Sequence, residues 1–293
     1  MSEAWYERDW VLGGGKFRLR FGKIDVTTEV DQNEYANDEN GQFMSPVFVN
    51  NPAVEWASYS FGVVASYEAE RWSFTLGYED ADSGWEDLFD YPFLVGQLAV
   101  SSNFLGHSGN YRFYVWYQGE KHLKWDDLED YFAQKIEPEN EDPAWGFGVS
   151  FDQEVAEGIG LFFRYGYRGE DLVGYANYDE SGAFDPEATD FSYGFEHAFT
   201  GGVSLSGRFW GRAEDELGIG LAMFLLADDY EDYWEKEGVY AGREGVRIDT
   251  DTEYHIEVFY RYQVNEHLAL TPDFQYTWNP AGLDDHGFWV FSL

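Results

Sequence analysis

The residues with the clearest chemical potential are arginines that alternate with apolar residues along short runs of the chain. A planar guanidinium donates hydrogen bonds in a fixed fork, so an array of them can bind carboxylates or hydroxyl-rich molecules. The alternation assigns eight of the twelve arginines to one face of these runs: Arg18, Arg20, Arg71, Arg112, Arg164, Arg168, Arg208 and Arg261.

Aromatic side chains on the same face extend this chemistry. The C–H faces of a sugar ring can lie on aromatic planes while its hydroxyls take hydrogen bonds from guanidinium groups. We therefore predict a water-filled lumen lined by Arg18, Arg20, Arg112, Tyr114, Trp116, Arg164, Arg208, Trp210, Glu257 and Arg261. A second interpretation is equally open, in which the arginines pair with acids on neighbouring strands and stiffen the wall; the candidate partners are Glu79, Glu253, Glu257 and Asp273.

The sequence gives little support for covalent catalysis or for metal binding. The chain has no cysteine, which excludes disulfides, thiolate metal sites and a cysteine nucleophile. Glu253, His255 and Glu257 have metal-compatible spacing on one strand face, but a solvated lumen wall is the simpler account. The carboxylate pair of a glycosidase cannot be singled out among 56 acidic residues. We predict no enzyme activity, no cofactor and no metal site.

The elements that must position these residues alternate apolar and polar side chains with a period of two. The clearest runs span residues 16–23, 71–80, 110–118, 144–153, 158–168, 199–212, 253–263 and 267–278, with weaker ones at 57–67, 93–101 and 217–227 and short ones at 3–10 and 287–293. Each is about ten residues long, which suits a tilted transmembrane β-strand. The sequence therefore predicts about twelve or thirteen strands.

The connections between these runs fall into two classes. Long ones span about 25–56, 119–143, 169–190 and 228–250, whereas tight ones read EAE, QEVAEG, RAEDE and VNEH. Outer-membrane barrels have short periplasmic turns and long extracellular loops. We predict an all-β protein, an antiparallel transmembrane β-barrel forming a single domain over residues 1–293. A secreted soluble β-sandwich or lectin-like protein is the alternative.

The composition of the chain limits the classes of partner that it can bind. The mean hydropathy is -0.49 and aromatic residues make up 20% of the chain, without any stretch long enough for a membrane helix. A net charge of -38 opposes nucleic-acid binding. The acids concentrate in the long connections, where they could solubilise the loops, hold divalent cations against lipopolysaccharide, or repel anionic solutes. Calcium binding at Asp80, Asp82 and Asp87 is only weakly indicated.

Five stretches resemble the carbohydrate-selective porin family of the OprB type: EAWYERDW…GKFRLRFGKID (from Glu3), NEYANDENGQFMSPVFVNNP (from Asn33), WGFGVSFDQEVAEGIGLFFRYGY (from Trp145), FTGGVSLSGRFWGRAEDELGIGLA (from Phe199) and EYHIEVFYRYQVNEHLALTPDFQYTWNPAG (from Glu253). The last is the most specific. The resemblance implies a 16-stranded barrel, usually trimeric, through which sugars diffuse across the outer membrane of a Gram-negative-type bacterium. Expected partners are outer-membrane lipid or lipopolysaccharide, sugars or small polar solutes, and two further copies of the chain.

The family pattern also sets expectations for strand number and for one loop. It begins upstream of Glu3, so about three N-terminal strands of the family are expected to be missing. Counting back from the C-terminus against sixteen strands, residues 25–56 join the fifth and sixth strands and are predicted to line a constriction. The functional alternatives are a porin for ions and small solutes without sugar preference, and a secreted sugar-binding β protein.

Overall fold

The structure is a computed structural model. It describes residues 3–82, 88–104, 106–134, 136–139, 142–169, 171–174, 178, 181–185, 194–235, 249–283 and 287–293.

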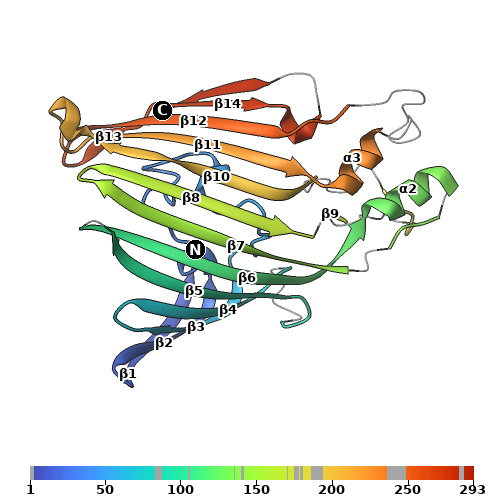
Figure 1. Cartoon of the computed structure of the whole chain (residues 1–293). Helices are drawn as coiled ribbons and strands as arrows, with labels where there is room; N and C mark the ends of the chain where they lie inside the picture. Colours follow the sequence, from blue (N-terminus) through green and yellow to red (C-terminus); the bar gives the residue numbers. More distant parts are fainter. Residues whose placement is uncertain are drawn as a thin grey trace.

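One large antiparallel sheet dominates the fold, and Figure 1 shows its pronounced curvature. Its strands are β1 (Ala4–Leu12), β2 (Gly15–Ile24), β3 (Ser60–Glu68), β4 (Trp72–Asp80), β5 (Pro92–Phe104), β6 (His107–Lys124), β7 (Asp142–Ala156), β8 (Ile159–Arg168), β9 (Leu172–Gly174), β10 (Phe195–Ser206), β11 (Glu216–Leu226), β12 (Glu253–Asn265), β13 (Leu268–Leu270), β14 (Asp273–Trp278) and β15 (Phe288–Ser292). Strands adjacent in sequence pair along the order β1-β2-β3-β4-β5-β6-β7-β8-β10-β11-β12-β14-β15, while β13 pairs with β12 and β9 with β6. The predicted all-β, antiparallel architecture is confirmed, with thirteen strands on this path among the described residues.

Two of the predicted runs are not single continuous strands. Run 199–212 was expected to be one strand, but β10 stops at Ser206 and residues Gly207–Trp210 form a 3-10 turn, η2. The Ser206 hydroxyl accepts from the Arg208 N–H, and Gly211 takes a left-handed conformation that closes the turn. Run 267–278 divides into β13 and β14 around Pro272, which lacks the N–H that a ladder requires.

The two faces of the sheet differ as the alternation predicts. Large apolar side chains cover the outer face, among them Phe113, Val115 and Leu221, which are 59%, 63% and 58% exposed. The inner face instead carries buried polar groups such as Thr75 and Gln97. An apolar exterior on this scale suits hydrocarbon rather than water.

The segment between β2 and β3, residues 25–56, packs against the inner face and is called the inner loop below. Figure 1 shows it in blue behind the strands. It contains the 3-10 turn η1 (Val26–Thr28) and the short helix α1 (Pro46–Val49). Two apolar clusters attach it to the wall. In the first, Val26, Val30 and Val54 pack with wall residues that include Phe93 and Trp116; in the second, Phe43 and Phe48 pack with Phe162 and Phe259. The core therefore lies between a loop and a sheet.

Helices α2 (Trp125–Gln134) and α3 (Asp228–Glu235) lie beyond the ends of the strands that the long connections join, beside β9. Their contact is aromatic, with the Trp125 and Tyr230 ring centroids 5.0 Å apart. Large parts of the predicted long loops 169–190 and 228–250, together with Asp87, lie outside the described residues. In the part of the chain that is described, no helix has both the length and the apolar character to cross a membrane.

Candidate functional site

The inner loop is fixed to the wall chiefly by Arg164 of β8. This side chain is fully buried, and its Nε lies 3.1 Å from each carboxylate oxygen of Asp31 in the loop. Its other N–H groups donate, at 2.7 to 3.0 Å, to the carbonyl oxygens of Asp31, Ala36, Phe48 and Val49. The hydroxyl of Tyr114 on β6 also donates to Asp31, at 3.0 Å. A buried charge with this many partners is compensated and holds the loop in one position.

Further wall side chains bind the backbone of the inner loop at other points. The carboxylate of Glu257 on β12 accepts from the N–H groups of Met44 and Ser45, at 2.5 and 3.1 Å. Glu79 on β4 accepts from the Val26 N–H at 3.3 Å, and Gln97 on β5 accepts from the Asp31 N–H at 2.9 Å. The loop is therefore attached along its length, from β4 to β12.

A first cleft lies between the inner loop and strands β2 to β6, at the end of the sheet where the turns are short. We call it the arginine cleft. It measures about 250 Å³ and is lined by Arg18, Glu29, Ser66, Glu68, Ala69, Glu70, Arg71, Trp72, Ser73, Thr75, Gln97, Ala99, Ser101, Asn110 and Arg112. Its lining combines guanidinium donors with hydroxyl and amide groups, which can hydrogen-bond a polyhydroxyl solute from several sides.

Three arginines of this region, Arg18, Arg20 and Arg112, are held by carboxylates. Arg18 and Arg20 both contact Glu29 of the inner loop, at 3.4 and 2.8 Å. Arg112 contacts Asp152 at 2.7 Å. The wall-stiffening interpretation is thus correct that these arginines are paired, but the partners are Glu7, Asp9, Glu29 and Asp152 rather than the four acids expected. Pairing leaves Arg18 about one quarter exposed, so it still faces the cleft.

A second cleft, the carboxylate cleft, lies on the other side of the inner loop and opens at the same end of the sheet. It measures about 400 Å³ and is lined by Glu34, Tyr35, Gln42, Glu154, Gly158, Ile159, Gly160, Ser204, Ser206, Ala213, Glu214, Asp215, Glu216 and Arg261. Arg261 is the one arginine among these lining residues, against five acids. The lining therefore favours cations over anions.

Titratable groups of the carboxylate cleft outside the strands have shifted pKa values. Burial, and next the carboxylate of Asp152, raise the pKa of the Glu34 carboxyl. Burial raises the pKa of Tyr35 to about 12. Asp215, in the turn before β11, accepts from Arg212, Tyr260 and the Gln263 N–H, and these bonds lower its pKa to about 2. As the pH falls, Glu34 therefore becomes protonated at a higher pH than an ordinary glutamate, and Asp215 at a lower pH than an ordinary aspartate.

The structure distributes the predicted lumen residues among three environments. Arg18 and Arg112 line the arginine cleft, with Arg20 beside them on β2, and Arg261 lines the carboxylate cleft. Tyr114, Trp116, Arg164 and Glu257 face inward but are buried beneath the inner loop. Arg208 and Trp210 lie in the exposed turn η2, where Arg208 pairs with Glu157 at 2.5 Å and Trp210 donates to Tyr260 at 2.9 Å.

The expected positions of six residues are therefore corrected. Tyr114, Trp116, Arg164 and Glu257 are covered because the loop occupies the space that alternation alone leaves open to water. Arg208 and Trp210 leave the wall because β10 ends before them.

Several lining residues were missed by the sequence interpretation. Ser66, Thr75 and Gln97 share the inward face with the arginines, so the same alternation could have identified them. Asp31 and Glu29 lie in an irregular loop, and no periodic signal marks them. Within the described ranges there is no group of three or more histidine or acidic residues that could hold a metal ion.

Comparisons with known proteins give a family match and a curated relative. Residues 1–288 match the model of a family described as carbohydrate-selective porin, OprB family. A curated relative from Aquifex aeolicus (strain VF5), described as an uncharacterized protein, is 28% identical over 146 residues, which is 50% of this chain and 37% of the relative.

Solved structures give the same result for the fold. The high-pH structure of Pseudomonas putida OprB has a TM-score of 0.72 at 16% identity, covering 99% of this chain and 71% of that one. The low-pH structure of the same protein has a TM-score of 0.52 at 14% identity, covering 100% and 66%. At these identities the likeness establishes a shared β-barrel fold.

Proposed function

The chain belongs to the carbohydrate-selective porin, OprB family, a family of outer-membrane β-barrel proteins, and from this premise we propose that it lets sugars and other small polar solutes diffuse passively through its interior. The family and the fold indicate a channel rather than an enzyme. Outer-membrane location also sets aside the secreted sugar-binding alternative. The observation that carries the proposal is the arginine cleft.

The chemistry of the arginine cleft suits neutral, hydroxyl-rich solutes. Arg18 and Arg112 present guanidinium donors whose charges are already balanced by Glu29 and Asp152. A balanced ion pair can donate to and accept from a sugar hydroxyl without attracting a particular ion. Ser73, Thr75 and Gln97 add weak hydrogen-bonding positions along the wall. Several weak sites in series allow entry without trapping the solute.

The inner loop is the proposed constriction. Its two clefts lie on either side of it, and it is attached from β4 to β12, so it reduces the open cross-section inside the sheet. Its position rests on buried groups, chiefly Arg164 and Asp31. A constriction held this firmly keeps a fixed diameter while solutes pass.

Planar-bilayer recordings of the purified native protein test the proposal. We expect added mono- and disaccharides to reduce the open-channel current reversibly. Arg18→Ala and Arg112→Ala should each weaken this sugar effect about tenfold, the scale of one charge-assisted hydrogen bond. Arg208→Ala is the matched control, because Arg208 lies in an exposed turn and does not line the arginine cleft. Sugars that leave the wild-type current unchanged would refute sugar passage.

A second candidate function rests on the carboxylate cleft. With five acids against Arg261 among its lining residues, that cleft suits a channel for ions and small solutes without sugar preference. The two candidates differ in one measurement: the ionic channel shows cation selectivity but no current reduction by sugars.

The remaining expected partners are proposals of the same kind. They are a homotrimer and contacts of the acidic outer loops with lipopolysaccharide, both of which the resemblance to the family implies. The mass of the detergent-solubilised native complex tests the trimer directly: three chain masses are expected, and a single chain mass would refute it.

A further inference from the structure

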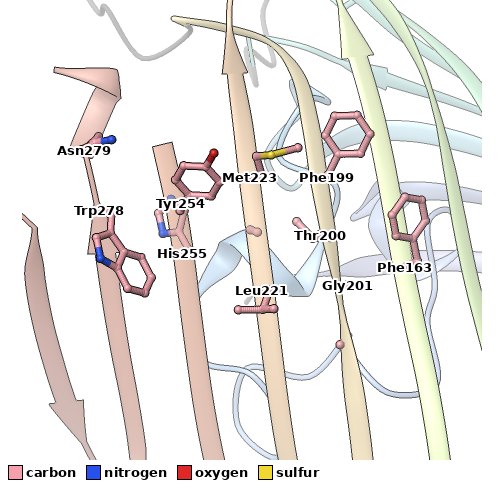
Figure 2. A pocket seen from close by; sticks show the side chains of 12 residues that line it. Phe163, Phe199, Thr200, Gly201, Leu221, Met223, Tyr254, His255, Trp278 and Asn279 are labelled. Carbon is pink, nitrogen blue, oxygen red and sulfur yellow. The ribbon is translucent and has the colours of Figure 1, made fainter. Parts of the chain in front are cut away.

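The inner loop carries a groove that neither of the two clefts includes. It measures about 690 Å³, is lined by inner-loop residues and by Tyr59 just before β3, and is called the loop groove below. A groove of similar size, about 750 Å³, lies on the outer face of the sheet, and Figure 2 shows Phe163, Phe199 and Leu221 standing around it. That outer groove is apolar and borders lipid, whereas the lining of the loop groove mixes aromatic, amide and hydroxyl groups.

The loop groove lies on the face of the inner loop that is turned away from the wall. The described residues that line it fall between Asp25 and Tyr59, so the strands of the sheet contribute none of them. The opposite face of the loop is occupied, because Phe43 and Phe48 pack against β8 and β12. A solute on the free side of the inner loop therefore meets this groove.

One buried donor in the loop groove lacks a partner. Asn50 lines the groove directly after helix α1, and the nitrogen of its side-chain amide is buried without a hydrogen bond to any described residue. An unpaired buried donor is unfavourable, so such a group calls for an explanation. The last side-chain torsion of asparagine has two broad minima, so the amide can turn to donate to a ligand or accept from it.

Two aromatic side chains border the same groove. The Trp56 ring is fixed on one side by Phe93 and Tyr114, at centroid distances of 5.8 and 6.4 Å, and its N–H donates to the Asn51 carbonyl oxygen at 3.2 Å. Tyr59 is 44% exposed and has a positive backbone φ of 32°. Such strained conformations in residues other than glycine cluster at ligand sites. Planar faces held in this way suit the C–H face of a sugar ring.

The charge of the loop groove opposes anions. Asp25 and Glu39 are the acids among the described residues that line it, and those residues include no lysine or arginine. The Asp25 carboxylate already accepts from the N–H and the hydroxyl of Thr27, at 2.9 and 2.6 Å, and it raises the pKa of the nearby Tyr59. Glu39 is exposed to water. Carboxylates solvated in this way still repel an anion, whereas a neutral solute does not feel that repulsion.

We propose that the loop groove is a binding site for a neutral monosaccharide, which lies on Trp56 and Tyr59 and hydrogen-bonds with the Asn50 amide. Asp25 discriminates against sugar acids at this site. The inference rests on the proposed function, because it takes the solutes that reach the inner loop to be sugars. It gives the free face of the constriction a selective site of its own, separate from the arginine cleft on the wall side.

Saturation-transfer NMR of glucose with the detergent-solubilised native protein measures binding, and liposome swelling measures passage separately. Wild type should bind glucose and bind glucuronate more weakly. Asn50→Leu keeps the size of the side chain and removes the amide, so the half-saturating glucose concentration should rise about fivefold, the scale of one neutral hydrogen bond. Its unfolding temperature should equal or exceed that of wild type, because an unpaired buried donor is removed.

Asn40→Leu is the matched control. It makes the same change in the inner loop, at an exposed asparagine that does not line the groove, and it should bind glucose as wild type does. Asp25→Asn tests the discrimination, since it keeps an oxygen that can accept from Thr27 but removes the charge. The ratio of glucose affinity to glucuronate affinity should fall about fivefold, the effect of one unit charge at contact distance in water.

Failure of the loop groove as a site is distinguishable from failure of sugar passage. Glucose that enters liposomes without binding, or binds Asn50→Leu as it binds wild type, overturns the inference and leaves the channel intact. So does binding that only Arg18→Ala weakens, since the sugar then occupies the arginine cleft alone.

Two further outcomes overturn the inference. A loss of both binding and stability in Asn50→Leu would show that Asn50 supports the loop, and binding of glucosamine without glucose would make the groove a cation site. Glucose that binds through Asn50 but does not enter liposomes would instead support the site and refute passage.

Discussion

The two clefts open at the same end of the sheet and both border the inner loop, yet the charges of their lining residues differ. The arginine cleft is lined by three arginines and three glutamates, whereas the carboxylate cleft has Arg261 against five acids. A balanced set of donors and acceptors favours neutral polar solutes, while an unbalanced acidic set concentrates cations. One interior thus presents two chemically distinct surfaces, and sugar passage and ion selectivity should be separable by mutation.

The two halves of the wall also hold the inner loop in different ways. On the β2–β6 side, ion pairs such as Arg20 with Glu29 connect loop and wall. On the β8–β12 side, inward glycines admit aromatic rings of the loop: a Cβ at Gly160 would lie 2.2 Å from Tyr35, and one at Gly220 would lie 2.8 Å from Phe43. Apolar packing holds the loop on both sides, through Val26, Val30 and Val54 in the first cluster and Phe43 and Phe48 in the second, and the ion pairs with Glu29 add charge on the β2–β6 side. Arg164 connects the two, and its removal should affect both clefts.

The largest effect is expected from Arg164→Met. It leaves Asp31 buried without its cation, which costs about 3–5 kcal/mol in buried ion pairs of other proteins. We expect a lower unfolding temperature, a displaced inner loop, a larger single-channel conductance and a weaker sugar effect. Thermal unfolding and bilayer recording measure these together.

The double variant Arg164→Met with Asp31→Leu separates charge from position. It removes the unpaired carboxylate, so most of the lost stability should return. The loop carbonyl oxygens that accept hydrogen bonds from Arg164 still lack their donor, so the inner loop should stay displaced and the conductance should stay high. A conductance equal to wild type in both variants would contradict the assignment of the inner loop as the constriction.

Alternation predicted the sheet better than it predicted the site. A period of two depends only on which face of a strand meets lipid, and that constraint acts on every strand equally, from Phe17 to Phe291. Whether an inward residue such as Arg18 or Arg164 meets water depends on what covers it, here an irregular loop without any periodic signal. Arg208 shows a second limit, because the end of β10 is decided by a serine cap and a left-handed glycine.

A smaller effect is expected from neutralising the carboxylate cleft with Glu214→Gln and Glu216→Gln. Each unit charge acts on a passing cation with about 1 kcal/mol at contact distance in water, so cation preference should fall about fivefold per residue at most. The reversal potential in a salt gradient measures it. Glu266→Gln, in an exposed turn outside both clefts, is the control. If Glu214→Gln and Glu216→Gln weaken the sugar effect as much as they weaken cation preference, the two clefts are not independent.

The pH dependence of selectivity sharpens the same comparison. Glu34 has a raised pKa, caused first by burial and then by Asp152, so it loses its charge before an ordinary glutamate as the pH falls. Cation preference should therefore begin to decline above the usual range of glutamate titration. Glu34→Gln should remove this early decline and leave the sugar effect unchanged. Reversal potentials recorded from neutral to acidic pH distinguish the selectivity of the wild type from that of Glu34→Gln.

The smallest effect concerns the turn that borders the carboxylate cleft. The pKa of Asp215 is about 2 in the folded protein, below its ordinary value of 3.8, chiefly because Arg212 donates to it. A lowered acid pKa contributes stability above the unfolded value and loses it as the pH falls through the folded value. The wild type should therefore be more stable than Asp215→Asn above about pH 4, and it should lose this advantage as the pH falls from about 4 to about 2. Unfolding temperatures of the two proteins should converge at the acid end; parallel curves would show that the bonds of Asp215 do not depend on its charge.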